Sequence, residues 1–96
     1  MREHELKTLP TYWQAIASGE KTFEVRRDDR GFQRGDVLLL QRLEKTPLGG
    51  WRVETDYNGK PAYVLRRVVK WILTGGQFGV EPGYVVMSIA DEPKKD

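Results

Sequence analysis

Apolar and polar residues alternate along residues 21–27, directly after a short apolar helical pattern. Phe23 and Val25 interleave with Thr22, Glu24 and Arg26. A period of two is the spacing of a β-strand whose two faces differ in polarity. The pattern therefore predicts a strand that puts Phe23 and Val25 into a core and aligns a hydroxyl, a carboxylate and a guanidinium on the opposite face.

A helix is expected just before this strand, after a first strand over residues 4–8. Leu9, Trp13, Ile16 and Ala17 fall on one helical face. Pro10 suits the first turn of a helix, and Gly19 suits the left-handed stop after it. The helix thus ends where the next strand begins, and we expect a cleft at this corner.

Strands dominate the rest of the chain. The apolar run at 37–43 predicts a strand buried on both faces, and residues 84–89 predict the last strand. Segments 51–57 and 60–73 flank Asn58-Gly59, which indicates a hairpin. Within the second segment Arg66 and Arg67 point to opposite faces, so one of them shares the apolar face unless a bulge intervenes.

Composition bounds the architecture and the chemistry. Five or six short strands with one helix near the start predict a small α+β domain or a closed barrel. Ninety-six residues, 39% of them hydrophobic, fit a single domain over 1–96, with a polar tail at 91–96 that frays. The absence of cysteine and the single histidine, His4, leave no ordinary zinc ligand set, so we expect neither a metal nor a cofactor. His4 itself is expected at the surface or at a barrel end. A charged N-terminus and the lack of a long apolar run predict a cytoplasmic protein without membrane partners.

Positive charge is clustered rather than large. The net charge is +2, but arginines at 26, 27, 30 and 34 lie close together, and residues 66, 67 and 70 form a second basic group. Clustered arginine attracts phosphates even on a nearly neutral protein. The alternative is that both clusters are solvated faces.

Gly19, Lys21, Glu24 and Arg26 together spell G-x-K-x-x-E-x-R. This spacing resembles the signature of the ASCH branch of the PUA-like superfamily. The segments at 4–10, 35–40 and 81–87 also resemble an ASCH-type subfamily labelled as a domain of unknown function, and the resemblance covers residues 4–89. It implies a small PUA-like β-barrel of five or six strands with one helix after the first strand, and a ligand cleft between that helix and the motif strand.

The resemblance favours a module that binds RNA or a modified nucleotide. Lys21 and Arg26 would hold a phosphate or a base edge, while Glu24 keeps the two cations aligned. The alternative for Glu24 and Arg26 is a simple surface salt bridge. The candidate nucleic-acid-binding residues are Lys7, Lys21, Thr22, Glu24, Arg26, Phe78 and Tyr84.

Two other classes of function stay open. Relatives in the wider ASCH group include amidohydrolases acting on acylated cytidine, and ribonucleases; in such an enzyme Lys21 and Glu24 would be the catalytic candidates. The sequence departs from the amidohydrolase pattern because Glu24 stands where that pattern has threonine. A protein-interaction role would use the exposed edge of the long hairpin. The sequence leaves the ligand, any protein partner and the oligomeric state open.

Overall fold

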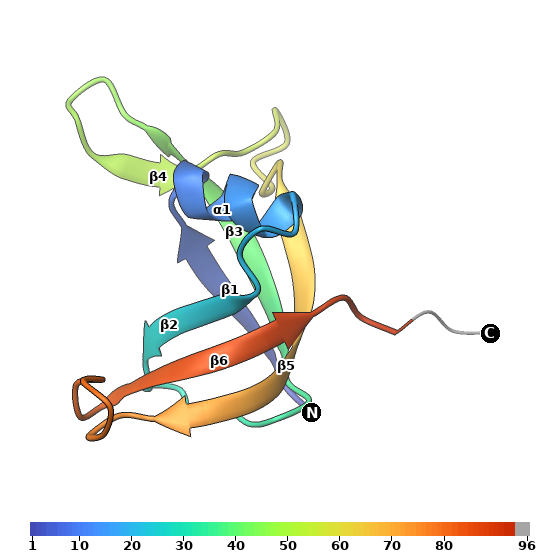
Figure 1. Cartoon of the computed structure of the whole chain (residues 1–96). Coiled ribbons are helices and arrows are strands. Elements are labelled where there is room, and N and C mark those ends of the chain that lie inside the picture. The colour runs from blue at the N-terminus through green and yellow to red at the C-terminus, as the bar shows by residue number, and fades with distance from the viewer. Residues whose placement is uncertain (94–96) are drawn as a thin grey trace.

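A computed structural model of the chain describes residues 1–93, and one curved sheet carries its architecture (Figure 1). The elements are β1 (Glu3–Thr8), α1 (Pro10–Ala17), β2 (Phe23–Arg27), β3 (Val37–Lys45), β4 (Trp51–Val53), β5 (Val64–Thr74) and β6 (Tyr84–Ala90). The strand order is β1-β3-β5-β6-β2, with β4 attached to β3. β1 runs parallel to β3, and the other pairs are antiparallel. The prediction of an α+β domain with a helix after the first strand is confirmed.

The sheet is open, so the expected closed barrel is wrong. β1 and β2 are the two edges of the strand order and do not pair with each other within residues 1–93. The sheet curls enough for the side chains of Thr8 on β1 and Arg26 on β2 to form a hydrogen bond across the gap, at 3.2 Å. Polar side chains therefore connect the two edges where a barrel would have backbone hydrogen bonds.

Helix α1 begins and ends as its sequence predicts. Pro10 occupies the first turn, and Gly19 adopts a left-handed φ of 85° just beyond the last turn. Trp13 and Ile16 are buried in the main core, whereas Leu9 and Ala17, at the ends of the expected apolar stripe, are exposed. The indole Nε1 of Trp13 donates to the Leu40 carbonyl at 3.0 Å. This bond and the buried Trp13 ring fix the helix against β3.

The expected hairpin between residues 51–57 and 60–73 is not formed as predicted. β4 pairs with β3 instead, with Lys45 opposite Trp51 and Leu43 opposite Val53. The segment at 46–50 is the turn that joins them, because Gly49 supplies the left-handed φ of 88° that a tight turn needs. The Asn58-Gly59 turn closes only a single bridge, between Thr55 and Pro61.

The two adjacent arginines of β5 point to opposite faces by simple alternation, and Arg67 is the one that shares the apolar face. Arg67 pairs with Leu38 on the inner face, and its side chain is only 16% exposed. Arg66 points outward, where it forms ion pairs with Glu3 and Glu92. A register shift between Val69 and Trp71 then turns Trp71 outward, leaving it 60% exposed.

The C-terminal segment follows β6, which ends at Ala90. Of the tail expected to fray at 91–96, residues 94–96 lie outside the part of the chain that the structure describes. In residues 1–93, no helix has the length and apolar character needed to cross a membrane.

Candidate functional site

The two faces of β2 are reversed relative to the prediction. Glu24 is 3% exposed, whereas Phe23 and Val25, expected in the core, are 44% and 50% exposed. Alternation along the strand holds, but pairing with β6 decides which face is inside. Glu24 stands opposite the fully buried Met87, so the polar face of β2 must share the inner face of the sheet.

A cleft of about 510 Å³ opens between the two edge strands and the start of α1. We call it the β1–β2 cleft. Its lining combines cations, one carboxylate and aromatic or apolar groups: Lys7, Thr8, Leu9, Tyr12, Lys21, Phe23, Glu24, Val25 and Arg26. The volume lies within the range typical of small-ligand sites. The cleft expected between the helix and the motif strand is therefore present.

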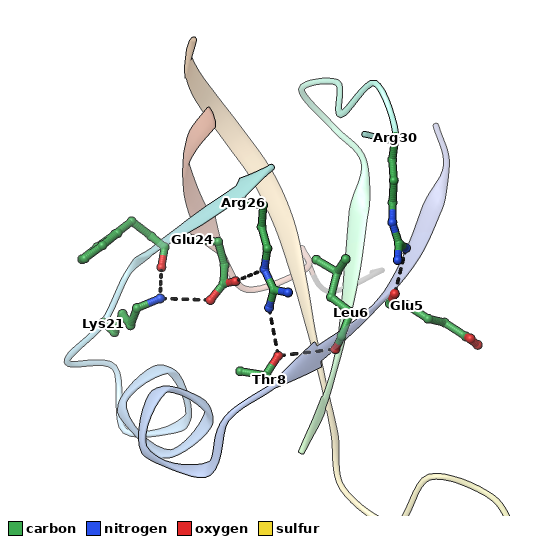
Figure 2. Close-up of polar contacts among 8 residues, drawn as sticks. Glu5, Leu6, Thr8, Lys21, Glu24, Arg26 and Arg30 are labelled. Atoms are coloured by element: carbon green, nitrogen blue, oxygen red, sulfur yellow. Dashed lines mark hydrogen bonds and ion pairs between the residues drawn. The ribbon is translucent and has the colours of Figure 1, made fainter. Parts of the chain in front are cut away.

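A chain of charge-assisted hydrogen bonds crosses the cleft (Figure 2). Lys21 Nζ donates to Glu24 Oε1 at 2.9 Å, and Arg26 Nε donates to Glu24 Oε2 at 2.7 Å. Arg26 Nη2 continues the chain to Thr8 Oγ1, and Lys21 Nζ also donates to the Phe23 carbonyl at 2.6 Å. Because the Glu24 side chain is only 4% exposed and both its oxygens are bonded, it acts as a fixed clamp for the two cations.

The clamp leaves an excess of positive charge in the cleft. Lys21 and Arg26 share one carboxylate, and Lys7 makes no side-chain hydrogen bond or ion pair within residues 1–93. A guanidinium carries five N–H donors and an ammonium three, so donors on Lys21 and Arg26 remain without a protein acceptor in the described chain. The side chains of Lys21 and Arg26 are 17% and 24% exposed. An anion entering the cleft could accept hydrogen bonds from both.

Aromatic rings stand beside the cations. Lys21 Nζ lies 4.8 Å from the Phe23 ring centre and 5.6 Å from that of Tyr12. Tyr12 is 51% exposed, so its ring is accessible to a ligand. Side chains of this kind can stack on a planar group held next to an anion.

The structure brings four of the seven predicted site residues together: Lys7, Lys21, Glu24 and Arg26 line the cleft. It places the other three elsewhere. Thr22 lines a second hollow at the end of α1, and Tyr84 stacks with Arg27, 5.8 Å away, at the far end of β2. Phe78 sits in the β5–β6 loop, 85% exposed. Sequence alone does not show that this loop lies at the opposite end of β2 from Lys21.

The other five residues that line the cleft were not among the candidates: Thr8, Leu9, Tyr12, Phe23 and Val25. The sequence held a signal for Thr8. Leu6 and Thr8 lie two residues apart on the first strand and therefore share a face, so the apolar Leu6 places Thr8 on the inner face, where both side chains are buried. Phe23 was assigned to the core because it is apolar. Only the register with β6 shows that its ring points away from Met87.

His4 is buried, not at the surface, and lies outside the cleft. Its Nε2 and Asp36 Oδ2 are 2.8 Å apart, and its ring packs edge-on against Phe32. Burial raises the pKa of Asp36, but hydrogen bonds from His4 and from the backbone N–H groups of Arg2 and Gln33 outweigh burial and hold that pKa below its ordinary value. The pair thus fastens the beginning of β1 to the turn before β3.

The described chain offers no evident metal site. Within residues 1–93, no three histidine, cysteine, aspartate or glutamate side chains gather closely enough to hold a metal ion. The chemistry that the cleft itself provides is hydrogen-bond donation, positive charge and stacking.

Comparison with known proteins identifies the family. A family model described as a domain of unknown function, DUF3850, matches residues 3–89. A relative in Escherichia phage P2, named as an uncharacterized 12.9 kDa protein in the GpA 3′ region, is 35% identical over 51 residues. That alignment covers 53% of this chain and 47% of the phage protein, so the chain spans about half the length of this curated relative.

Proposed function

This chain belongs to the DUF3850 family, and we propose that it binds single-stranded RNA or a modified nucleotide in the β1–β2 cleft. The observation that carries the proposal is the clamped pair of cations. Lys21 and Arg26 are held by the two oxygens of Glu24, at 2.9 and 2.7 Å, with further donors facing an open hollow. Donors fixed before the ligand arrives bind with less loss of side-chain entropy than free surface cations.

The other features of the cleft are consistent with a nucleotide. A phosphate would accept from Lys21 and Arg26, and Tyr12 offers a base an exposed ring whose centre lies 5.6 Å from Lys21 Nζ. Thr8 adds a hydroxyl next to the guanidinium. The resemblance of Gly19, Lys21, Glu24 and Arg26 to the ASCH signature, and through it to PUA-like proteins, supports the same class of ligand; a PUA-like ancestry here would mean a barrel opened between β1 and β2.

Fluorescence anisotropy with a labelled single-stranded RNA at low salt tests this function. Lys21→Ala and Arg26→Ala should each weaken binding about tenfold or more, since a hydrogen bond to a charged group contributes about 1.5–3 kcal/mol. Each substitution that removes one phosphate contact should also make the negative slope of log K against log salt shallower by about 0.7.

Matched controls separate the site from general charge. Lys60→Ala removes an exposed lysine of the 58–60 turn, and Arg52→Ala removes an arginine of β4 whose ion pair with Glu44 is exposed. Each changes the net charge by the same amount as its cleft counterpart. The proposal fails if the wild type does not bind RNA at low salt, or if the cleft variants bind no worse than these controls.

Catalysis on an acylated cytidine, or on RNA itself, is the second candidate function. It is favoured by one observation, an amine and a carboxylate only 2.9 Å apart in the cleft, at Lys21 and Glu24. We rank it below binding because both Glu24 oxygens are bonded to cations, and a general base needs a free oxygen within reach of its substrate. Release of cytidine from N4-acetylcytidine by the wild type, abolished in Lys21→Ala, would reverse this ranking.

A further inference from the structure

Two smaller hollows adjoin the β1–β2 cleft and share lining residues with it. The first, of about 280 Å³, is lined by Leu9, Pro10, Thr11, Tyr12 and Trp51, and it shares Leu9 and Tyr12 with the cleft. The second, of about 390 Å³, lies at the end of α1 and shares Lys21 with the cleft. The three hollows therefore follow one another along α1, from its first turn to the residues just beyond its last, and we call this row of hollows the track. Figure 1 shows β4, which carries Trp51, near the start of this helix.

Exposed aromatic rings and cations recur along the track. Trp51 is 46% exposed, with Lys45 Nζ 5.7 Å from its ring centre, and Tyr12 follows at the boundary with the cleft. Lys21 and Arg26 occupy the middle, and Arg67 lines the hollow at the end of α1. Arg67 is paired there with Asp91 at 3.5 Å, but that carboxylate is 89% exposed and can yield to a phosphate.

We propose that this track holds a single strand of RNA several nucleotides long, rather than one nucleotide alone. The inference rests on the proposed function of the cleft and extends it. Proteins that bind single strands combine a positively charged groove with rings on which successive bases stack. A phosphate on Lys21 and Arg26 places one base against Tyr12, and the next base in that direction meets Trp51. A mononucleotide occupies the cleft alone and provides no base to stack on Trp51.

The test compares AMP with octaadenylate, using isothermal titration calorimetry on the full chain. The wild type should bind octaadenylate at least about tenfold more tightly than AMP. Trp51→Ala should remove about tenfold of this gain, because stacking of one base on an aromatic ring supplies a factor of this size. AMP binding by Trp51→Ala should stay as in the wild type, which also shows that the variant is folded.

Trp71→Ala is the matched control, because Trp71 is likewise an exposed tryptophan, 60% exposed, with the Arg34 guanidinium 5.0 Å from its ring centre. It lies on β5, outside the three hollows, and its loss should leave both affinities unchanged. A second measurement avoids the truncation. Trp71→Phe leaves two tryptophans, Trp51 and the buried Trp13, and octaadenylate should quench the part of the fluorescence that Trp51→Ala removes, whereas AMP should not.

These measurements distinguish failure of the extended track from failure of nucleotide binding in the cleft. If AMP binds with dependence on Lys21 but octaadenylate binds no more tightly, or if Trp51→Ala behaves like Trp71→Ala, the extended track is wrong and the single-nucleotide cleft stands. If neither ligand binds the wild type, both proposals fail together.

Discussion

Replacing Glu24 by glutamine removes the negative charge of the clamp while keeping its shape. In the wild type the carboxylate accepts from Lys21 Nζ at 2.9 Å and from Arg26 Nε at 2.7 Å, and its side chain is 4% exposed. A glutamine side chain has one acceptor oxygen, and its NH₂ group must face the other cation. At least one charge-assisted hydrogen bond is lost and a donor is turned towards a donor.

The loss of stability in Glu24→Gln depends on the number of hydrogen bonds that are lost and on the exposure of the two cations. One hydrogen bond to a charged group is worth about 1.5–3 kcal/mol, and an unpaired buried partner adds to the cost. Both cations are partly exposed, at 17% and 24%, so either can turn towards water and recover part of the loss. We therefore expect Glu24→Gln to lower the free energy of unfolding by about 2 kcal/mol, which for a domain of this size lowers Tm by about 10 °C.

Urea unfolding followed by circular dichroism, at low salt and neutral pH, measures this difference. Glu44→Gln is the control, because Glu44 forms an exposed ion pair with Arg52 at 2.9 Å and its loss should cost less than about 0.5 kcal/mol. A change for Glu24→Gln no larger than that of the control would refute the conclusion that Glu24 is a buried clamp.

Three further predictions concern stability and the limits of the site. The pKa of Asp36 is held below its ordinary value of 3.8, so the stability that its ionised form contributes is fully present above about pH 5 and is lost as the pH falls through the folded-state value. Asp36→Asn should therefore flatten the loss of stability at acid pH, measured by urea unfolding at several pH values. Gly75→Ala should destabilise the protein by more than about 2 kcal/mol in thermal unfolding, because a Cβ there would collide with the Glu81 carbonyl, whereas Gly50→Ala, whose Cβ would meet only a side-chain hydroxyl at 3.3 Å, should cost far less. Phe78→Gly should leave RNA affinity unchanged in the anisotropy assay and raise stability by up to about 1 kcal/mol, since Phe78 has a left-handed φ of 52° and lies outside the cleft; a weaker affinity would return this residue to the site.

The sequence predicted secondary structure well at positions where a single proline or glycine determines the backbone conformation. Pro10 and Gly19 bounded the helix, and Trp13 and Ile16 marked its buried face, as the structure confirms. The alternation of β2 was also correct as a period. The assignment of its inner and outer faces was wrong, because the prediction assumed that the apolar side chains face the core. The register with β6 instead places Glu24 opposite the buried Met87, and the two ion pairs of Glu24 compensate for the burial of its charge.

Long-range pairing was the part that sequence could not supply. Turns at Gly49 and at Asn58-Gly59 lie on either side of the short strand β4, and each could form a hairpin with it. In the structure β4 pairs with β3 through the turn at Gly49. The distance of Phe78 from the cleft likewise depends on how β5 and β6 extend away from α1, as Figure 1 shows. The proximity of Lys21, Glu24 and Arg26 was predictable because all three lie within one short segment.

A titration of ¹⁵N-labelled protein with octaadenylate, followed by NMR, tests the central claim most directly. The account predicts that the largest shifts fall on the backbone amides of Thr8, Tyr12 and Lys21 and on the Arg26 Nε–H resonance, all of which belong to the β1–β2 cleft. Shifts confined to the β5–β6 loop around Phe78, with the cleft signals unmoved at saturation, would contradict it.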